Sequence, residues 1–316
     1  SSRRRHTRYP LVTGVQTCAL PISILALSVG HLSAQQLNTS SLYELQGLFH
    51  NPATAGTYAP ALVGAVYRTQ WSSFNGAPRT ATVFGSFDLP EQKIGVGGYL
   101  YSDKTGPTSR TGVTLAFSKH IPLNNGARFS AGIEARGLQY AIDRAKLTQT
   151  LGADPAIAGG DNSFKVDAGA GVAYTAKRFQ VGLSVSQLIQ SKLNFYKGTL
   201  TPAEEARLYR HYYLHGSYKW NVDEQTTITP SFCVIYLPNA PTDFQGGIRV
   251  EHKQSFWWGV AARARQSFIL SAGVHVKNAF SIGYSFDIYK TPLSVFDAGA
   301  NAHELMLRYS LKSKTK

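Results

Sequence analysis

Hydrophobic and polar residues alternate along most of this chain, from Ala61 almost to the last residue. Alternation with a period of two places one set of side chains on each face of a β-strand. In the last run, Leu305, Leu307, Tyr309 and Leu311 share one face, opposite Glu304, Met306, Arg308 and Ser310. About fourteen such runs, each closed by a turn signal, predict strands near Ala61–Trp71, Arg79–Leu89, Lys93–Asp103, Ser109–His120, Ala127–Ile142, Phe164–Ala176, Arg178–Leu188, Arg210–Asn221, Thr226–Leu237, Thr242–Glu251, Phe256–Arg265, Ser267–Val276, Ala279–Ile288 and His303–Lys312.

The connections between these runs fall into two groups. Those after even-numbered runs are short: Pro90–Gln92, Asn124–Gly126, Ala176–Arg178, Val222–Gln225, Lys253–Gln254 and Lys277–Asn278. Those after odd-numbered runs include every long one: Ser72–Pro78, Asp143–Ser163, Ile189–Tyr209 and Tyr289–Ala302. Short periplasmic turns and long outer loops are typical of outer-membrane barrels, and closure removes the exposed strand edges. The pattern therefore predicts an all-β fold: a single transmembrane antiparallel β-barrel of about fourteen strands.

Aromatic residues gather near the predicted strand ends, where an amphipathic ring suits the headgroup layer of a membrane. We expect them to form interfacial girdles, the alternative being the aromatic core of a soluble sandwich. They are Trp71, Phe74, Tyr99, Tyr101, Tyr140, Tyr196, Tyr212, Tyr213, Trp220, Trp257, Trp258 and Tyr289.

Composition agrees with a membrane barrel. Charged residues make up 16% of the chain, below the ~25% usual in soluble domains, while aromatic residues reach 12%. No apolar run approaches the ~20 residues that a helical membrane span needs. We therefore expect a multi-pass barrel in the cell outer membrane.

The first 34 residues do not fit the barrel pattern. Residues 1–23 resemble a translated sequencing-adapter read-through and are expected to be an artefact outside the fold. Residues 24–34 are short, apolar and end in small side chains, as in the remnant of a signal peptide cleaved after Ala34; a short buried strand or helix is the alternative. Four of the +14 formal charges belong to Arg3, Arg4, Arg5 and Arg8, leaving +10 for the rest. Cleavage would leave Cys233 as a single cysteine, so no disulfide framework is expected.

A turn precedes the first strand. Pro52 fixes its own φ and pushes Asn51 out of the helical region, while Gly56 permits a positive φ. The helical spacing of Leu42, Leu45, Leu48 and Phe49 therefore ends before Ala53. An ordinary turn is one interpretation of this segment; an organising element of the barrel is the other.

No catalytic constellation is recognisable: the chain has no Gly-x-Ser-x-Gly elbow, no His-Glu-x-x-His and no phosphate loop. Gly169-Ala170-Gly171 begins like a dinucleotide fingerprint but lacks its third glycine, so a glycine-rich strand is the simpler interpretation. We expect no enzyme activity, no cofactor and no metal, because no carboxylate or cysteine stands at ligand spacing to the polar-face residues His211, His215 and His275.

Charged residues on the polar strand faces are expected to point into the lumen, paired or hydrated. They are Glu134, Arg136, Asp167, Arg249, Glu251, Arg263, Arg265, Glu304 and Arg308. The basic residues are scattered and form no stripe, which argues against nucleic acid and favours outer-membrane lipid, lipopolysaccharide or an acidic partner. In the loop Ile189–Tyr209, the segment Thr201–Arg207 has a helix N-cap and Pro202 at the first helical position. With Asp143–Ser163 it would form an outer surface that either docks a partner or only protects the barrel.

Taken together, four segments resemble the PorP/SprF family. They are Phe49–Gly56, with Asn51, Pro52, Ala53 and Gly56; Tyr67–Trp71, with Arg68, Gln70 and Trp71, followed by Gly76–Thr80; Gly95–Gly98; and His303–Tyr309. The resemblance covers residues 35–316. It implies an outer-membrane protein of Bacteroidota associated with the type IX secretion system, acting in export or surface attachment of large adhesins and, in some species, in gliding. Its implied partners are other secretion-system subunits and the C-terminal domain of a secreted adhesin.

With this resemblance, residues 35–57 are expected to fold into the barrel mouth as a plug whose Asn-Pro-Ala turn seats it against the wall, and residues 58–316 to form the barrel. A non-enzymatic docking or anchoring barrel is the leading hypothesis. A FadL-like channel for small hydrophobic solutes is the second, since that family is also fourteen-stranded with a plug. A soluble lectin-like sandwich, the third, would purify without detergent.

Overall fold

The computed structural model describes residues 40–151, 162–192, 207–238, 240–277, 279–290 and 301–311. The predictions for residues 1–39, for Tyr196 and for the helix at Thr201–Arg207 fall largely or wholly outside these ranges. The elements are three 3-10 helices, η1 (Tyr43–Leu45), η2 (Gly47–Phe49) and η3 (Pro52–Thr54); one α-helix, α2 (Arg144–Leu151); and the strands β1 (Ala61–Gln70), β2 (Arg79–Leu89), β3 (Ile94–Thr105), β4 (Thr108–Pro122), β5 (Arg128–Ile142), β6 (Asn162–Thr175), β7 (Phe179–Ser186), β8 (His211–Tyr218), β9 (Trp220–Asn221), β10 (Thr226–Tyr236), β11 (Asp243–His252), β12 (Phe256–Arg263), β13 (Ser267–Val276), β14 (Phe280–Tyr289) and β15 (Ala302–Leu311).

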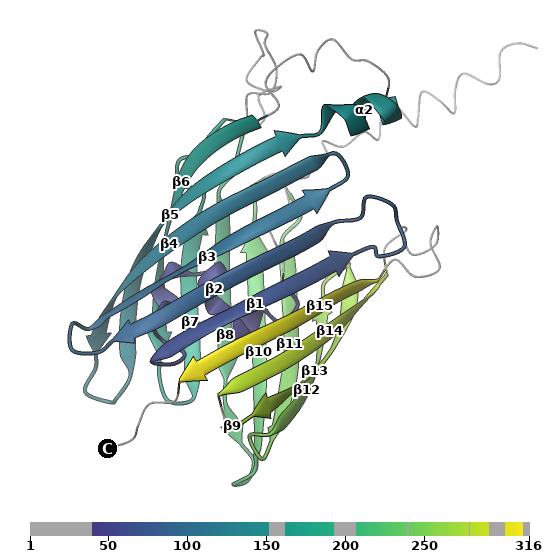
Figure 1. Cartoon of the computed structure of the whole chain (residues 1–316). Helices are drawn as coiled ribbons and strands as arrows, with labels where there is room; N and C mark the ends of the chain where they lie inside the picture. Colours follow the sequence, from purple (N-terminus) through teal and green to yellow (C-terminus); the bar gives the residue numbers. More distant parts are fainter. Residues whose placement is uncertain are drawn as a thin grey trace, which may run out of the picture. The chain divides into compact units, whose positions relative to one another are not determined.

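Fourteen of these strands close into one antiparallel barrel, which confirms the predicted fold class (Figure 1). Each strand pairs with its neighbour in sequence, and β15 returns to β1, with Ala61 opposite Leu311 and Gln70 opposite Ala302. Strand β9 is the exception: its two residues pair only with β10, beside the ring. Closure leaves no free strand edge around the ring, as a hydrocarbon environment requires.

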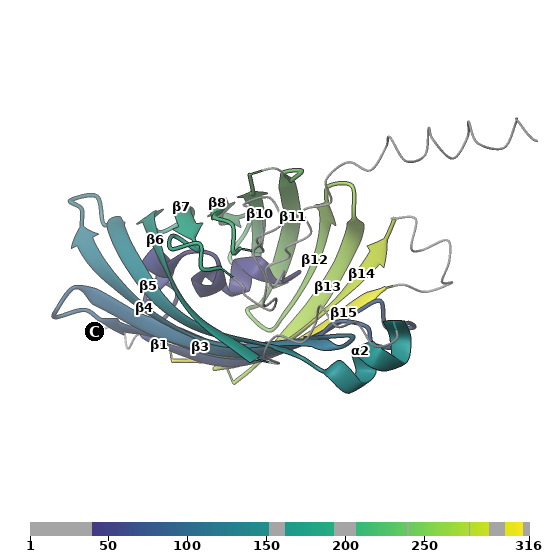
Figure 2. The ribbon, with the colours of Figure 1, turned by 90° about the horizontal axis from the view of Figure 1, so that it is seen from above.

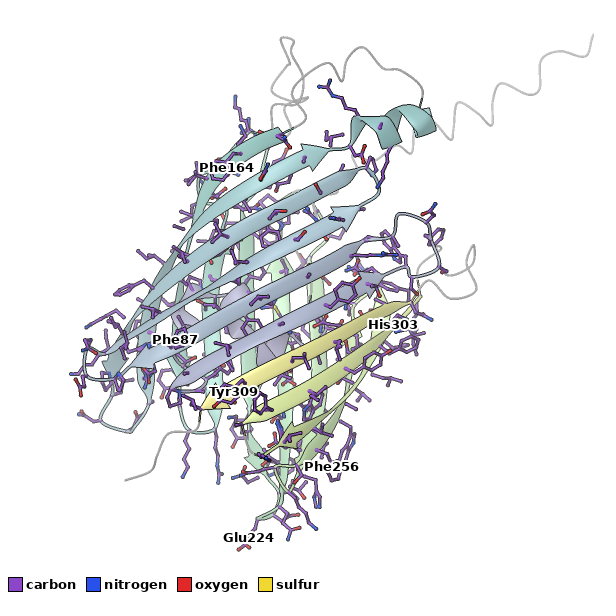
Figure 3. The ribbon with its side chains drawn as sticks, in the orientation of Figure 1. Phe87, Phe164, Glu224, Phe256, His303 and Tyr309 are labelled. Atoms are coloured by element: carbon purple, nitrogen blue, oxygen red, sulfur yellow. The ribbon has the colours of Figure 1, made fainter. Side chains whose placement is uncertain are left out.

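The two faces of the wall differ in polarity. On β4, Val113, Leu115 and Phe117 point outward with 41%, 67% and 44% of their surface exposed, whereas Thr114 and Ser118 point inward and are buried. Phe87, Phe164 and Phe256 likewise lie on the outer face (Figure 3). An apolar outer band with polar residues inside is what the alternating sequence pattern predicts for a lipid-facing barrel.

Connections segregate to the two ends as predicted. At one end, which we call the turn end, neighbouring strands are joined by tight connections, including a turn whose central residues Lys253 and Gln254 have φ of 53° and 51°. The other end, the loop end, carries the connections after β1, β5, β7 and β14 and the helix α2. This helix was not predicted; its first turn is capped by Asp143, whose Oδ1 accepts from the Lys146 amide at 3.2 Å.

The predicted aromatic girdle is only partly correct. Tyr212, Trp220 and Trp258 face outward and are exposed, but Tyr213 and Trp257 are 4% and 2% exposed and face inward. Two adjacent residues of one strand cannot share a face, so half of each aromatic pair had to enter the lumen. Tyr99 and Tyr101 also line an internal cavity. Arg265, expected on a polar strand face, lies instead in the turn after β12 with φ of 62°.

Residues 40–57 form a compact segment inside the barrel, which we call the plug (Figure 2). The helical spacing of its leucines yields short 3-10 helices instead of one α-helix, because Gln46 (φ −135°) and Asn51 (φ −149°) interrupt the helical backbone. Leu42 and Leu45 pack into the main apolar cluster with Leu62, Val66, Phe84, Trp257 and Met306 of the wall.

Candidate functional site

The plug is fastened to two separate parts of the wall. Its first residues contact β1, β14 and β15, and its Asn-Pro-Ala turn contacts β4 to β8. These two groups of strands lie on different sides of the ring, so the plug crosses the lumen and ties them together.

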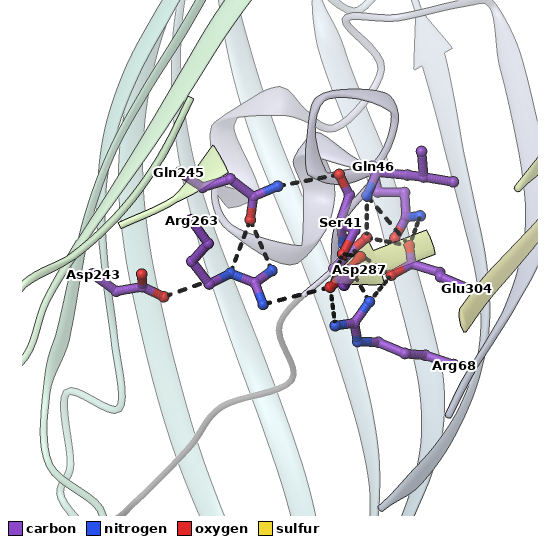
Figure 4. Close-up of polar contacts among 10 residues, drawn as sticks. Ser41, Gln46, Arg68, Asp243, Gln245, Arg263, Asp287 and Glu304 are labelled. Atoms are coloured by element: carbon purple, nitrogen blue, oxygen red, sulfur yellow. Dashed lines mark hydrogen bonds and ion pairs between the residues drawn. The ribbon is translucent and has the colours of Figure 1, made fainter. Parts of the chain in front are cut away.

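The first attachment is a buried ion cluster that we call the clamp (Figure 4). Arg68 of β1 lies with Nη2 2.6 Å from Asp287 Oδ2 of β14 and Nη1 3.0 Å from Glu304 Oε2 of β15. All three side chains are almost completely buried, at 3%, 0% and 0% exposed. The register places Arg68 directly opposite Glu304 across the β1–β15 pair, so barrel closure itself brings these charges together.

The plug completes the clamp through Ser41. Its hydroxyl donates to Asp287 Oδ1 at 2.7 Å, and its backbone amide donates to Glu304 Oε2 at 2.8 Å. Ser40 adds a hydroxyl bond to Glu304 Oε1 at 2.5 Å. Buried carboxylates need such hydrogen bonds because a single cation does not fill all their acceptor positions.

A second arginine extends the clamp. Arg263 of β12 donates from Nη2 to Gln245 Oε1 at 2.8 Å, and Gln245 Nε2 in turn donates to the Ser41 carbonyl at 3.1 Å. Arg263 Nη1 also lies 3.9 Å from Asp287 Oδ2. Every backbone and side-chain polar group of Ser41 is therefore held by the wall or by the clamp.

The second attachment is the Asn51 side chain. Its Oδ1 accepts from the Ala53 amide at 2.9 Å and caps η3, as an asparagine at this position can. Its Nδ2 donates to the carbonyls of Val172 and Leu183 at 3.0 and 3.3 Å and lies 3.1 Å from His215 Nε2. One side chain thus fixes the turn internally and binds it to β6, β7 and β8.

Glycines of the wall make room for this turn. A Cβ on Gly182 would lie 2.5 Å from Asn51 Nδ2, one on Gly132 would lie 2.6 Å from Ala53 Cα, and one on Gly95 would lie 2.6 Å from the Ala55 carbonyl carbon. A Cβ on Gly171 would lie 3.0 Å from Asn51 Cγ. We call these four residues the glycine seat. Only residues without a Cβ allow the plug backbone to approach the wall so closely.

Serines around the glycine seat hold the plug backbone. Ser118 donates to the Ala53 carbonyl at 3.1 Å, Ser184 donates to the His50 carbonyl, and Ser86 accepts from the Gly56 amide at 2.7 Å. Gly56 has φ of +72°, which a residue with a side chain rarely adopts. The turn is therefore bound through its main chain as well as through Asn51.

His50 lies at the centre of the plug and is 6% exposed. Its ring packs edge-on against Tyr43 and Tyr213, with centroids 6.1 and 5.5 Å away. Burial, with the nearby His215 ring, lowers the pKa of His50 from 6.5 to about 3, so the imidazole is neutral at physiological pH. A neutral ring suits this apolar contact.

The plug separates two internal spaces. The smaller, about 60 Å³, lies between the plug and the loop end. It is lined by Phe49, Tyr99, Tyr101, Tyr140 and Tyr213 together with the paired cations Arg68, Arg110 and Arg136. Arg136 Nη2 lies 2.5 Å from Glu134 Oε1, and Arg110 Nη2 lies 2.5 Å from Asp103 Oδ2, so each of these arginines has a carboxylate partner.

The larger space, about 380 Å³, lies between the plug and the turn end. Arg249 crosses it with Nε 2.8 Å from Glu44 Oε1 of the plug and Nη1 2.8 Å from Glu251 Oε2. Arg308 donates to the Leu45 carbonyl of the plug at 3.4 Å. Six of the nine residues predicted to be lumen charges thus form two groups on opposite sides of the plug: Glu134, Arg136 and Glu304 line or border the loop-end space, and Arg249, Glu251 and Arg308 line the turn-end space. Asp167 is buried as well, and Arg263 belongs to the clamp.

Of the motif residues singled out in the sequence, Asn51, Pro52, Ala53, Gly56 and Arg68 lie in the plug or the clamp. Gln70 and Trp71 do not: Gln70 ends β1 at the loop end, where its amide donates to the Pro78 carbonyl at 3.0 Å, and Trp71 follows it. Sequence reasoning missed Ser41, Gly132 and Gly182. The sequence does show glycines on the inner faces of neighbouring strands. These glycines indicate that another part of the chain packs closely there, but not which part.

The described residues offer no metal site: no group of three histidine, cysteine or carboxylate side chains among them could hold an ion. No helix in the described ranges is long and apolar enough to cross a membrane. The arginines of the clamp and of the two internal spaces are engaged in salt bridges with carboxylates, as Arg68, Arg136 and Arg249 are, and this pairing suits the arrangement to binding and positioning the plug.

Comparison with known proteins gives one family match and a group of barrels with a similar fold. Residues 32–309 match the family described as type IX secretion system membrane protein PorP/SprF. Among solved structures, the outer membrane protein Omp33 of Acinetobacter baumannii is 10% identical, with a TM-score of 0.46 over 80% of this chain and 98% of that one. The CymD monoaromatic hydrocarbon channel is 11% identical, with a TM-score of 0.48 over 85% and 94%. The toluene transporter TbuX of Ralstonia pickettii is 10% identical, with a TM-score of 0.47 over 83% and 92%. No curated protein sequence matches this chain.

Proposed function

Because this chain belongs to the PorP/SprF family of type IX secretion system membrane proteins, we propose that it is a non-enzymatic outer-membrane barrel of that system that serves export or surface anchoring of secreted adhesins. The barrel lies in the outer membrane, as its closed fourteen-strand ring and apolar outer face require. In a gliding species of Bacteroidota, the anchored adhesin would attach the moving cell to the surface.

The observation that carries the proposal is the fixed plug. The clamp and the glycine seat hold residues 40–57 across the lumen by ion pairs and buried hydrogen bonds on both sides. A barrel closed in this way offers a rigid platform rather than a wide passage, since the space on the loop-end side is only about 60 Å³. Platform and docking functions need such rigidity, whereas bulk diffusion needs an open lumen.

The loop end is the expected docking face for the adhesin's C-terminal domain. Exposed cations surround it, including Arg79, Lys104, Arg210, Arg265 and Lys290. Such a ring attracts acidic protein surfaces and the phosphates of lipopolysaccharide. Other subunits of the secretion system are the second class of partner.

The test is deletion of the gene in its native host, followed by labelling of surface adhesin on intact cells. We expect the amount of adhesin on the cell surface to fall while its total cellular amount stays the same or rises. Expression of the unmodified chain in the deletion strain should restore the surface adhesin. Unchanged surface adhesin would refute the proposal. A pull-down from detergent-solubilised outer membranes, with mass spectrometry of bound proteins, would identify the partners: recovery of an adhesin C-terminal domain or of secretion-system subunits supports docking.

A FadL-like channel for small hydrophobic solutes is the second candidate. The loop-end space favours it, because Phe49, Val66 and Leu138 contribute apolar surface beside four tyrosines. A channel requires displacement of the plug, so single-channel conductance and solute uptake into proteoliposomes would distinguish the two. Conductance that rises with an apolar solute would favour the channel.

A further inference from the structure

The space between the plug and the turn end, which we call the vestibule, has an excess of positive charge. Its cationic lining residues are Lys177, Arg178, Lys219, Arg249 and Arg308, joined by His275, whereas Glu44 and Glu251 are the acidic residues among the described part of the lining. Both acids are engaged with Arg249, at 2.8 Å each. Glu251 also faces His275, whose Nε2 lies 3.8 Å from Oε1. Among the described residues that line the vestibule, no carboxylate pairs with Lys177, Arg178, Lys219 or Arg308.

Arg308 is a vestibule cation that reaches the plug. It projects from β15 toward the plug, where its guanidinium donates to the Leu45 carbonyl at 3.4 Å. Its Nε is buried and has no hydrogen-bond partner among the described residues. A buried guanidinium donor without an acceptor is costly, and a bound carboxylate would satisfy it.

Lys219 stands on the opposite wall, in the connection between β8 and β9. Its backbone amide is bonded to the Arg178 carbonyl at 2.6 Å, which fixes its position at the rim. Its ammonium group makes no hydrogen bond or ion pair with another described residue. Its side chain is exposed at the turn end, where a ligand that enters the vestibule would meet it.

The remaining lining combines a few apolar side chains, such as Leu45, Leu62 and Phe179, with many uncharged polar ones. Hydroxyl and amide side chains come from Thr57, Thr175, Gln180, Ser217, Asn221, Thr227, Thr229, Gln254 and Ser310. Such groups donate to and accept from peptide bonds, while the cations suit carboxylates. The volume of about 380 Å³ falls in the range of specific ligand pockets and exceeds what a single small anion fills.

From this lining, we propose that the vestibule binds an acidic peptide segment of a periplasmic partner, which enters at the turn end past Lys177 and Arg178 and places a carboxylate between Lys219 and Arg308. Lys177 and Arg178 are exposed on the turn between β6 and β7, so they meet the segment first. The site lies on the far side of the plug from the loops and does not rest on the proposed docking of adhesins.

The test measures binding of a fluorescein-labelled octapeptide of alternating glutamate and glycine to the purified barrel in a zwitterionic detergent, by fluorescence anisotropy. The matched octapeptide of glutamine and glycine is the neutral probe, and free glutamate is the small-carboxylate competitor. We expect the acidic octapeptide to bind, the neutral one to bind at least about tenfold more weakly, and free glutamate to compete only at far higher concentration.

The variant Lys219→Gln/Arg308→Gln should weaken binding of the acidic octapeptide by about tenfold or more. Its matched control is Lys93→Gln/Lys119→Gln, which removes the same charge from the turn end outside the vestibule and should change binding by less than about twofold. If loss of the Arg308 contact to the plug prevents folding, Lys219→Gln alone can be used, because its ammonium makes no hydrogen bond or ion pair with another described residue. This variant should weaken binding about threefold or more.

Three results would overturn the inference. Equal binding of the acidic and neutral octapeptides would show that carboxylates are not recognised. Equal loss in the vestibule and control variants would reduce the effect to general surface charge. Free glutamate competing as well as the octapeptide would leave a small-anion site without a peptide.

Discussion

The amide group of Asn51 occupies the space that a side chain on Gly171 would need: a Cβ built on Gly171 would lie 3.0 Å from Asn51 Cγ and even closer to Oδ1. The plug turn therefore packs so tightly against the barrel wall that there is no room for even one added methyl group at Gly171.

Gly171→Ala should push the Asn51 side chain out of its bonds to Val172 and Leu183. We expect a loss of about 1–3 kcal/mol in the free energy of unfolding, the usual range for an overpacked contact. The measurement is the temperature at which the barrel loses its folded mobility on a gel after heating in detergent. Gly85→Ala is the control, since its Cβ would meet Phe87 Cε2 at an ordinary 3.4 Å. Equal shifts in both variants would contradict the glycine seat.

Arg68→Met should be among the most destabilising single changes in the barrel. It leaves Asp287 and Glu304 buried without their cation, and breaking a buried pair in this way costs about 3–5 kcal/mol. Denaturant titration followed by tryptophan fluorescence measures it. Arg128→Met is the matched control: its pair with Asp88 spans 3.2 Å, but Arg128 is 32% exposed, so its loss should cost under about 1 kcal/mol. If both variants lost similar free energies of unfolding, burial of the Arg68 pairs would not explain the effect.

Asn51→Asp should harm the plug more than Asn51→Ala. The alanine variant loses the cap on Ala53 and the bonds to β6 and β7, a loss of about 1–3 kcal/mol. The aspartate variant keeps the acceptor but turns a carboxylate toward the carbonyls of Val172 and Leu183. Limited proteolysis between residues 40 and 57 measures plug release. A plug better protected in Asn51→Asp than in Asn51→Ala would show that the cap outweighs the contact with the wall.

Acidification should loosen the plug through His50. Its folded pKa of about 3 lies below the unfolded value of 6.5, so the unfolded chain binds one more proton between these values. The stability it contributes is therefore complete above pH 6.5 and is lost as the pH falls, at a limiting slope of about 1.4 kcal/mol per pH unit. From pH 7 to pH 5 we expect a loss of about 2 kcal/mol from this group. His50→Phe, which keeps a ring against Tyr43 and Tyr213, should lose correspondingly less over the same interval; an identical loss would exclude His50 as the cause.

Strand number and the segregation of loops could be predicted because they depend on local patterns, namely alternation and turn residues that each strand carries by itself. The Asn-Pro-Ala turn could be located for the same reason. The clamp could not: Arg68 and Asp287 are far apart in sequence, and only barrel closure makes them neighbours. The aromatic girdle was overpredicted because strand-end position does not reveal which face a ring takes. Gly132 and Gly182 of the glycine seat were missed because a glycine in a strand does not indicate which residue packs against it.

The clamp joins the first strand of the barrel to the last two. Arg68 comes from β1, whereas Asp287 and Glu304 come from β14 and β15, so the ion cluster cannot exist until the C-terminal strand has arrived and the seam has closed. Ser41 lies near the start of the described chain, but its hydroxyl and amide donate to Asp287 and Glu304, so these hydrogen bonds also require β14 and β15 to be in place. The contacts of the plug with the clamp thus require a closed seam, whereas those of Asn51 with β6, β7 and β8 do not. A barrel truncated before β15 would therefore lack Glu304, and with it one of the two carboxylates that bind Arg68 and Ser41.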